Sequence, residues 1–355
     1  VFGLIILFSA SYATSLNKFG NSYEYVGPQT IYAIMGLVAA LIVSRVDYHW
    51  LRRFAWPLYF VTLGLLVVVL FMPPIKGCRR WINVSGLPTI QVSEIAKFAL
   101  ILLLSHLFAR YQKRIEGQFP GAGPAQNLKL SIILPGLLLA PILLLLLLEP
   151  HHSAMILMCC IAASIMLVGG ALLRWFFLAG GVAVTGIALL LVTRGGYVAE
   201  RLQGWLQPFS DMQDSTRQTG QSLYTIGSGG LFGVGVGQGS LQYVFASTSD
   251  LIFGMLCEET GLLFAIIIAA VIAGLAFYAR AISATSRSTL YSIAACSVGG
   301  MFVFQSCLNI FGATDLLPLT GVTLPFVSMG GSSMMACWGL LSFIKAADER
   351  TYQGV

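Results

Sequence analysis

Three carboxylates mark one end of a long apolar run in the stretch STSDLIFGMLCEETG, residues 247–261. Asp250 lies at the mouth of the run, and Glu258 and Glu259 lie inside it. A charge in such surroundings is expensive unless it has a partner, about 2.5–3.5 kcal/mol on membrane-insertion scales. Glu258 follows Asp250 by a little over two helical turns, on roughly the same face. We therefore expect both glutamates to meet polar partners inside the protein, and Asp250 to be the acid at the outer entry.

A second charged pair lies in the stretch KGCRRWINVSGLPTIQVSEIAK, residues 76–97. Glu94 and Lys97 are three residues apart, so on a helix they share one face and can pair where either charge alone would be costly. The spacing leaves open whether this pair is structural or belongs to a binding site. Lys76 and Arg80 in the preceding loop are either anchors for lipid headgroups or ligands for phosphate.

The segment of residues 194–250 combines basic residues with a series of glycines, IGSGGLFGVGVGQGS. The glycines do not form a nucleotide-binding fingerprint, because no hydrophobic strand precedes them. They permit tight turns or a close approach of the backbone to a bulky ligand at the membrane surface. Arg201 and Arg217 flank them and could meet phosphate, although such residues are more often solvated charges.

The stretch LPLTGVTLPFVSMGGSS, residues 317–333, contains prolines and glycines that interrupt an otherwise helical pattern. Irregular backbone at membrane depth is tolerated only inside a protein or along a polar cavity. Ser332 and Ser333 either satisfy the freed backbone groups or line a substrate groove.

The elements that position these residues follow from the composition. Of the 355 residues, 57% are hydrophobic and only 10% are charged, which is typical of a polytopic membrane protein. The sequence predicts an all-α fold with about ten transmembrane helices, because a span needs about 20 apolar residues. We expect residues 1–13 to end a helix whose beginning is missing, since the chain starts at Val1. The other apolar runs are 27–44, 54–72, 91–109, 129–148, 152–170, 172–193, 251–279, 289–311 and 326–345.

The distribution of Lys and Arg predicts that both termini lie in the cytoplasm. Residues 194–250 then form a large extracytoplasmic loop before the eighth helix, and residues 1–355 form a single domain. The net charge of +6 fits this bias and an attraction to anionic lipids, and we expect no nucleic-acid partner. Neither the seven cysteines nor the pair His151 and His152 has the spacing of a metal site.

The motifs KGCRRWI, QVSEIAK, IGSGGLFGVGVGQGS, SDLIFGMLCEETG and PLTGVTLPFVSMGGSS, in this order, resemble the SEDS family (shape, elongation, division and sporulation), which includes FtsW and RodA. The resemblance covers essentially the whole chain. It implies a peptidoglycan glycosyltransferase that polymerises lipid II at the outer face of the bacterial cytoplasmic membrane with a class B penicillin-binding protein. The stretch EPHHSA, residues 149–154, stands where the family usually has Gln-Pro-Asp-Leu-Gly-Thr.

The resemblance assigns the catalytic base to Asp250, the intramembrane pair to Glu94 and Lys97, and an external arginine to Arg201. The reaction also needs positive charge for the departing diphosphate. Arg201, Arg217, Lys76, Arg80 or a divalent cation, Mg²⁺ or Mn²⁺, could supply it. The sequence identifies no metal ligands and no certain cofactor.

Two other functions remain open at this stage. A flippase for lipid-linked precursors would need a polar path across the bilayer, and the deep charges of the chain would have to form it. A non-catalytic scaffold for a transpeptidase would need only its helix surfaces. Loss of Asp250 separates the three, since a polymerase would fail, a flippase would suffer less and a scaffold would not respond.

Overall fold

The computed structural model of the chain describes residues 1–46, 48–74, 79–83, 89–118, 123–181, 185, 205–206, 209, 215–244 and 247–352. The chain divides into two units, which are treated separately below. Unit 1 comprises Val1–Ile34, Thr185–Gly274 and Val303–Met334. Unit 2 comprises Met35–Val184, Leu275–Phe302 and Met335–Val355.

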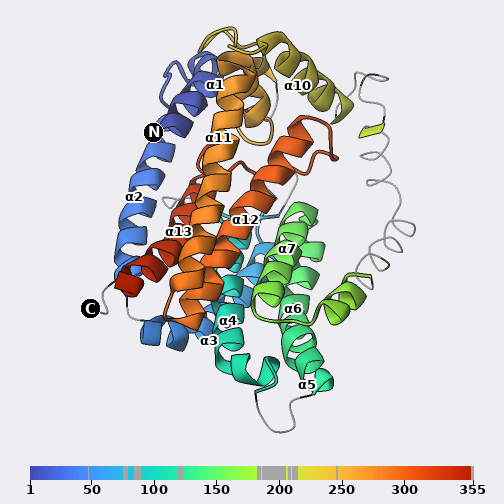
Figure 1. Cartoon of the computed structure of the whole chain (residues 1–355). Coiled ribbons are helices and arrows are strands. Elements are labelled where there is room, and N and C mark those ends of the chain that lie inside the picture. Colours follow the sequence, from blue (N-terminus) through green and yellow to red (C-terminus); the bar gives the residue numbers. More distant parts are fainter. Residues whose placement is uncertain are drawn as a thin grey trace. The chain divides into compact units, whose positions relative to one another are not determined.

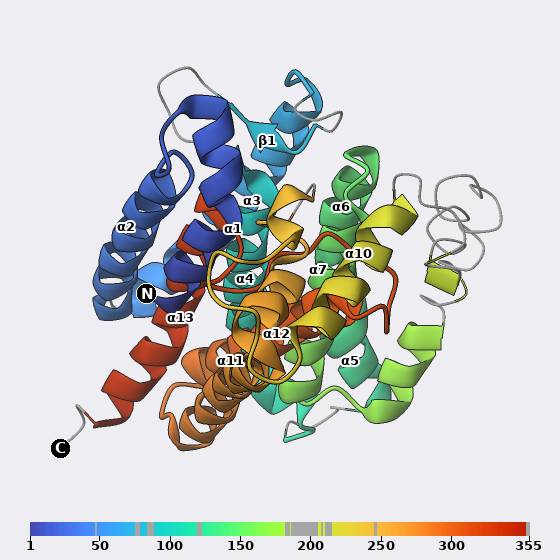
Figure 2. The same ribbon diagram turned by 90° about the horizontal axis from the view of Figure 1, so that it is seen from above.

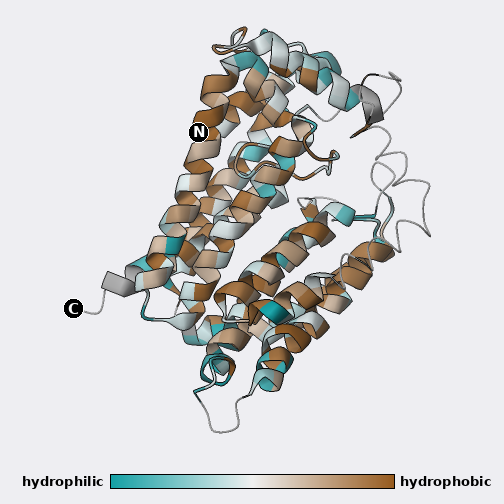
Figure 3. Cartoon of the chain, turned by 45° about the vertical axis from the view of Figure 1, so that its right-hand side comes forward, coloured by the Kyte–Doolittle hydropathy of each residue, from teal (hydrophilic) through white to brown (hydrophobic). Residues whose placement is uncertain are grey.

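Helices dominate the described residues, as the composition predicts (Figure 1). Six of the described helices are long and apolar enough to cross a membrane, and α7 is a shorter apolar helix. Figure 3 shows hydrophobic residues along the helices and hydrophilic residues mainly at their ends and connections. The labelled helices are α1 (Phe2–Phe19), α2 (Val26–Arg45), α3 (Tyr48–Leu70), α4 (Val92–Ile115), α5 (Pro124–Leu128), α6 (Leu134–Leu148), α7 (His152–Val168), α10 (Ser215–Gly229), α11 (Ile252–Thr285), α12 (Thr289–Ala313) and α13 (Gly331–Tyr352).

Shorter elements complete the fold. A π-helical turn, η1 (Lys129–Ile133), joins α5 to α6, and a 3₁₀ turn, η2 (Leu241–Tyr243), precedes α11. The strands β1 (Trp81–Ile82) and β2 (Ile90–Gln91) form an antiparallel pair in which Trp81 lies opposite Gln91.

Unit 2 is built around α4, which lies against α3, α6 and α7 (Figure 1). Almost every residue of α4 between Val92 and Phe108 is buried, including Glu94 and Lys97. The helices around it expose large apolar side chains; Phe60 and Val61 on α3 are each more than half exposed. Apolar surface of this kind is stable in a hydrocarbon solvent, which supports an integral membrane protein.

Several predicted boundaries differ from the observed ones by a few residues, and two of these differences concern the site. The last apolar run predicts a helix from residue 326, but α13 begins only at Gly331. Phe326 has a positive φ of 62°, and Pro325 before it and the glycines after it favour a non-helical path. The glycine series is predicted to lie wholly in a loop, but Gly227 and Gly229 belong to α10. Of the run 172–193, residues 173–181 and 185 are described and helical, and the others from 182 onward lie outside the described residues.

Candidate active site

Asp250 lies in the turn that leads into α11, within unit 1, and its side chain is half-buried. The backbone of this turn is held from a distant part of the sequence. The Met329 N–H donates a hydrogen bond to the Thr248 carbonyl at 2.8 Å. The Ser328 hydroxyl donates to the Ser249 carbonyl at 2.7 Å. The two residues before Asp250 are therefore fixed to the segment that precedes α13.

The carboxylate of Asp250 lies beside Gly321. A Cβ atom on Gly321 would be only 3.4 Å from Asp250 Oδ2, and the φ of +71° at this position disfavours any other residue type. Gly321 itself is exposed. The carboxylate thus borders an exposed glycine that presents no side chain to it.

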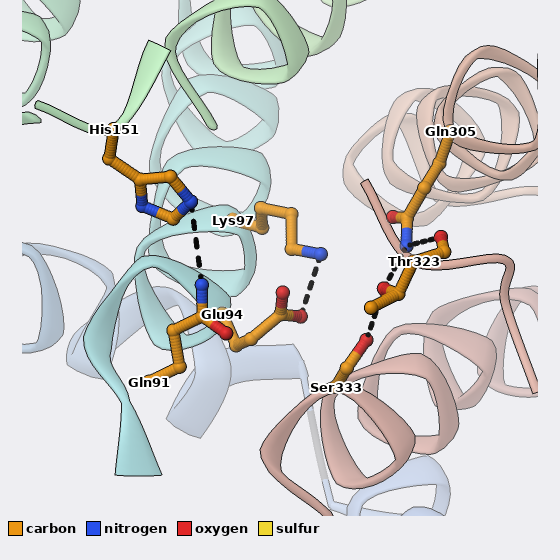
Figure 4. A network of polar contacts seen from close by, with 7 residues as sticks. All are labelled: Gln91, Glu94, Lys97, His151, Gln305, Thr323 and Ser333. Carbon is orange, nitrogen blue, oxygen red and sulfur yellow. Dashed lines mark hydrogen bonds and ion pairs between the residues drawn. The ribbon is translucent and has the colours of Figure 1, made fainter. Parts of the chain in front are cut away.

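Polar side chains support the irregular segment before α13. Gln305 Nε2 on α12 donates to the Thr323 carbonyl at 2.9 Å, and Thr323 Oγ1 lies 3.0 Å from Ser333 Oγ (Figure 4). Gln29 on α2 accepts from the Gly330 N–H at 3.1 Å and donates to the Ser328 carbonyl at 3.3 Å. These backbone groups, released by the prolines and glycines, are satisfied inside the unit, as required at membrane depth.

Ser333 is buried and joins this network through the hydroxyl of Thr323. Ser332 lies beside it at the start of α13 and is half-buried. Its role in substrate binding stays a prediction.

Glu258 and Glu259 meet polar partners, which confirms the expectation for these buried acids. Glu258 Oε1 accepts from the Ser240 N–H and the Ser240 hydroxyl, both at 2.7 Å, and Oε2 accepts from the Leu241 N–H at 3.0 Å. Glu259 Oε1 accepts from the Ser9 hydroxyl at 2.6 Å and the Gly237 N–H at 3.1 Å. Both acids therefore fasten the loop after α10 to α11.

Most of the glycine series lies in the loop that joins α10 to α11 and packs against α11 (Figure 2). Gly261, with a φ of 83°, interrupts α11 and releases backbone groups from the helix. The Val234 N–H donates to the Glu258 carbonyl at 2.9 Å, and the Leu262 N–H donates to the Gly230 carbonyl at 3.0 Å. The predicted tight turns are confirmed, since Gly230, Gly233, Gly235 and Gly237 have positive φ, and the close approach at this junction is of backbone to backbone.

In unit 2, Glu94 and Lys97 pair as their spacing predicts. Glu94 Oε2 and Lys97 Nζ are 2.6 Å apart, and the two residues are only 8% and 3% exposed (Figure 4). Removing one partner would leave an uncompensated buried charge.

Polar groups from the connection before α4 and from the connection between α6 and α7 meet near this pair. Gln91 Nε2 lies 3.5 Å from His151 Nε2 (Figure 4), and Arg80 Nη2 donates to the Pro150 carbonyl at 2.6 Å. Burial raises the pKa of Glu149 from 4.5 to about 7, although Arg80 acts in the opposite direction. Burial, with Arg80, Lys97 and His152, lowers the pKa of His151 from 6.5 to about 3. At neutral pH, His151 is therefore uncharged.

Some of the other predicted site residues lie outside the part of the chain that the structure describes. Lys76 and Arg201 lie outside the described residues, and Arg217 is described only as part of the backbone of α10. Asp250 and Ser332 belong to unit 1, whereas Arg80, Glu94 and Lys97 belong to unit 2. Within the described part of the chain, no three His, Cys, Asp or Glu side chains converge as metal ligands.

Sequence reasoning missed the amide side chains Gln29, Gln305 and Asn309. Each is buried and hydrogen-bonds the irregular backbone beside Asp250. The available signal was that three uncharged polar residues occur within apolar helices, where an unsatisfied amide is costly.

Known proteins resemble this chain over nearly its whole length. The FtsW/RodA/SpoVE family model, described as a cell cycle protein, matches residues 1–353. The chain is 32% identical over 339 residues to a probable peptidoglycan glycosyltransferase FtsW of Trichlorobacter lovleyi, covering 94% of this chain and 86% of that protein. It is 31% identical to the stage V sporulation protein E of Bacillus subtilis, covering 94% and 89%.

Solved structures show the same fold. A chain from a study of polymerisation and crosslinking by a peptidoglycan synthase complex matches with a TM-score of 0.76 and 25% identity, covering 99% of this chain and 98% of that one. The rod shape determining protein RodA of Thermus thermophilus matches with a TM-score of 0.66 and 24% identity, with the same coverage.

Fold and site together define a polytopic helical membrane protein with an acid at the mouth of one long helix and a buried ion pair on another. This chain belongs to the FtsW/RodA/SpoVE family.

Proposed function

We propose that this chain is a peptidoglycan glycosyltransferase that polymerises lipid II, with Asp250 as the general base. The observation that carries the proposal is the position of Asp250, whose carboxylate borders the exposed backbone of Gly321 while its own backbone is fixed. Its relatives named peptidoglycan glycosyltransferase support the reaction class.

The reaction joins a sugar hydroxyl of one substrate to the anomeric carbon of another. The new carbon–oxygen bond forms as the bond to the diphosphate breaks, so undecaprenyl diphosphate leaves. A sugar hydroxyl is a weak acid, so its proton must pass to Asp250 as the bond forms. A base held by its backbone is ready for this transfer without rearrangement.

The negative charge of the departing diphosphate needs cationic groups. We assign this task to basic residues near the outer surface, with Arg80, Lys76, Arg201 and Arg217 as candidates. A Mg²⁺ or Mn²⁺ ion that accompanies the diphosphate would also fit this chemistry. Polymerisation with and without a chelator, and with each ion added back, tests this part of the proposal.

We further propose that the protein lies in the bacterial cytoplasmic membrane with both termini in the cytoplasm, and that it works with a class B penicillin-binding protein. The Lys and Arg distribution supports the orientation. The solved relative from a peptidoglycan synthase complex supports an assembly of this kind.

The test is polymerisation of labelled lipid II by purified protein, with and without a class B partner, comparing wild type with Asp250→Ala. Loss of a general base is expected to reduce the rate by about 10²- to 10⁴-fold. Glu116→Gln is the matched control, because Glu116 is an exposed acid whose side chain accepts hydrogen bonds from its neighbours Gln112 and Gln118.

Each outcome separates the candidate functions. Glycan chains from wild type and Glu116→Gln, but not from folded Asp250→Ala, would support the polymerase. Chains that persist in Asp250→Ala would show that another residue is the base. No chains from wild type with partner and divalent ion would favour a scaffold, and transport of lipid II without polymerisation would favour a flippase.

A further inference from the structure

Asn309 on α12 connects the two segments that flank the Asp250 carboxylate. Its side-chain nitrogen Nδ2 donates to the Asp250 carbonyl at 3.0 Å and to the Val322 carbonyl at 2.7 Å. Val322 directly follows Gly321, the residue beside the carboxylate. One amide group therefore ties the catalytic turn to the backbone that the carboxylate faces.

The orientation of this amide is fixed by its surroundings. Both N–H groups of Nδ2 point to carbonyl oxygens, and a flipped amide would place its own oxygen against them. Asn309 is 2% exposed, and its Oδ1 atom is buried without a hydrogen-bond partner among the described residues. An unmet buried acceptor reduces stability, so packing alone would favour an apolar residue here. The two donated hydrogen bonds explain why an amide is present.

We propose that Asn309 is a positioning residue that sets the place of the Asp250 carboxylate relative to Gly321. This inference rests on the proposed function, because it assumes that Asp250 takes the proton. Displacement of a catalytic group by about 1 Å can reduce a rate by about 10²-fold. Asn309 acts through the Asp250 backbone and needs no contact with substrate.

Gln305 provides a matched control on the same helix. Its Nε2 donates to the carbonyl and the hydroxyl of Thr323, so it braces the same segment one turn earlier on α12. The hydrogen bonds of Asn309, unlike these, include the Asp250 carbonyl. If loosening of this segment were the only effect, substitutions at Asn309 and at Gln305 would lower kcat by similar factors.

The experiment compares Asn309→Asp, Asn309→Ala and Gln305→Glu in the lipid II polymerisation assay, with thermal unfolding as a measure of folding. Asn309→Asp keeps the shape of the side chain but leaves at most one donor, and Asn309→Ala removes both. We expect both Asn309 variants to lower kcat by about 10- to 100-fold with KM changed less than about threefold. Gln305→Glu should lower kcat by a clearly smaller factor than the Asn309 variants, because the hydrogen bonds of Gln305 reach Thr323 and not the Asp250 backbone.

Several results would overturn the proposal. Equal losses of kcat in Asn309→Ala and Gln305→Glu would reduce Asn309 to a brace for the segment, and a loss confined to KM would contradict a role in positioning the base. If Asn309→Asp does not fold, Asn309→Ala decides alone through kcat. An inactive Asp250→Ala beside fully active Asn309 variants would refute the inference while leaving the proposed function intact, whereas an inactive wild type would refute the function.

Discussion

Glu149 should make this protein less stable as the pH rises, and replacing it with Gln should remove that effect. Its side chain lies at the C-terminal end of α6 and is 1% exposed. Its Oε1 atom is buried without a hydrogen-bond partner in the described part of the chain, so the ionised form has little compensation beyond the charge of Arg80. Glu149→Gln keeps the size and removes the charge.

The magnitude follows from the pKa of Glu149. Burial raises it from 4.5 to about 7, so the folded protein keeps the proton over a pH range in which the unfolded chain loses it. The unfolded state binds fewer protons there, so the contribution of Glu149 to the free energy of unfolding falls as pH rises from about 4.5 to about 7. At about 1.4 kcal/mol per pH unit, the loss is roughly 3 kcal/mol.

The assay is thermal unfolding in detergent micelles at a series of pH values from about 4.5 to 8. Glu149→Gln should resemble wild type at the acidic end and become progressively more stable than wild type up to about pH 7, by roughly 3 kcal/mol. Glu116→Gln, a substitution of an exposed acid, should not show this change.

His151 provides a test in which the pH dependence of stability has the opposite sign. Its pKa is lowered to about 3, so the unfolded chain takes up a proton as pH falls below about 6.5 while the folded protein does not. His151 should therefore lower the stability of wild type as pH falls below about 6.5, in opposition to Glu149, and His151→Asn should become progressively more stable than wild type over that range. For Glu149, a difference in free energy of unfolding between Glu149→Gln and wild type that is the same at pH 5 and pH 8 would refute the reasoning.

Two further substitutions test the buried contacts. Lys97→Met should destabilise the protein by about 3–5 kcal/mol, because it leaves Glu94 unpaired. Adding Glu94→Gln to the same chain should recover most of this loss of stability. Thermal unfolding that shows no recovery would argue against the ion pair. Gly233→Ala should lower the melting temperature far more than Gly237→Ala. Both glycines have positive φ, so the backbone strain is similar. An added Cβ at Gly233 would collide with the Glu259 carbonyl, whereas at Gly237 it would meet no described atom within 4 Å. Equal melting temperatures for the two glycine variants would contradict the close approach of the loop to α11.

The sequence was sufficient to predict most of the helices and the local pairs. Apolar runs of sufficient length must form helices in a bilayer, because each helix satisfies its own backbone hydrogen bonds. The pairing of Glu94 with Lys97 follows from the helical period alone. The requirement of Glu258 and Glu259 for polar partners was also predictable, because an unpaired charge is unfavourable in apolar surroundings.

Boundaries were less predictable where helix and loop composition overlap. The helix α10 lies in a stretch whose polar residues and glycines indicated a loop, and its packing explains the difference. Ser222 on α10 donates to the Ala313 carbonyl at 2.9 Å, at the end of α12. A tertiary contact of this kind stabilises a helix that local propensity does not favour.

Only the tertiary structure decided which partners the irregular segments have. The sequence presented Asp250, Gly321 and Asn309 as separate features, and nothing in their local patterns indicated that one amide binds the backbone on both sides of the acid. It also presented Glu258 and the glycine series separately, although the acid caps the loop that those glycines form. A helix carries its hydrogen-bond partners within itself, whereas a kink or a broken helix takes them from elsewhere in the chain, and that choice exists only once the chain has folded.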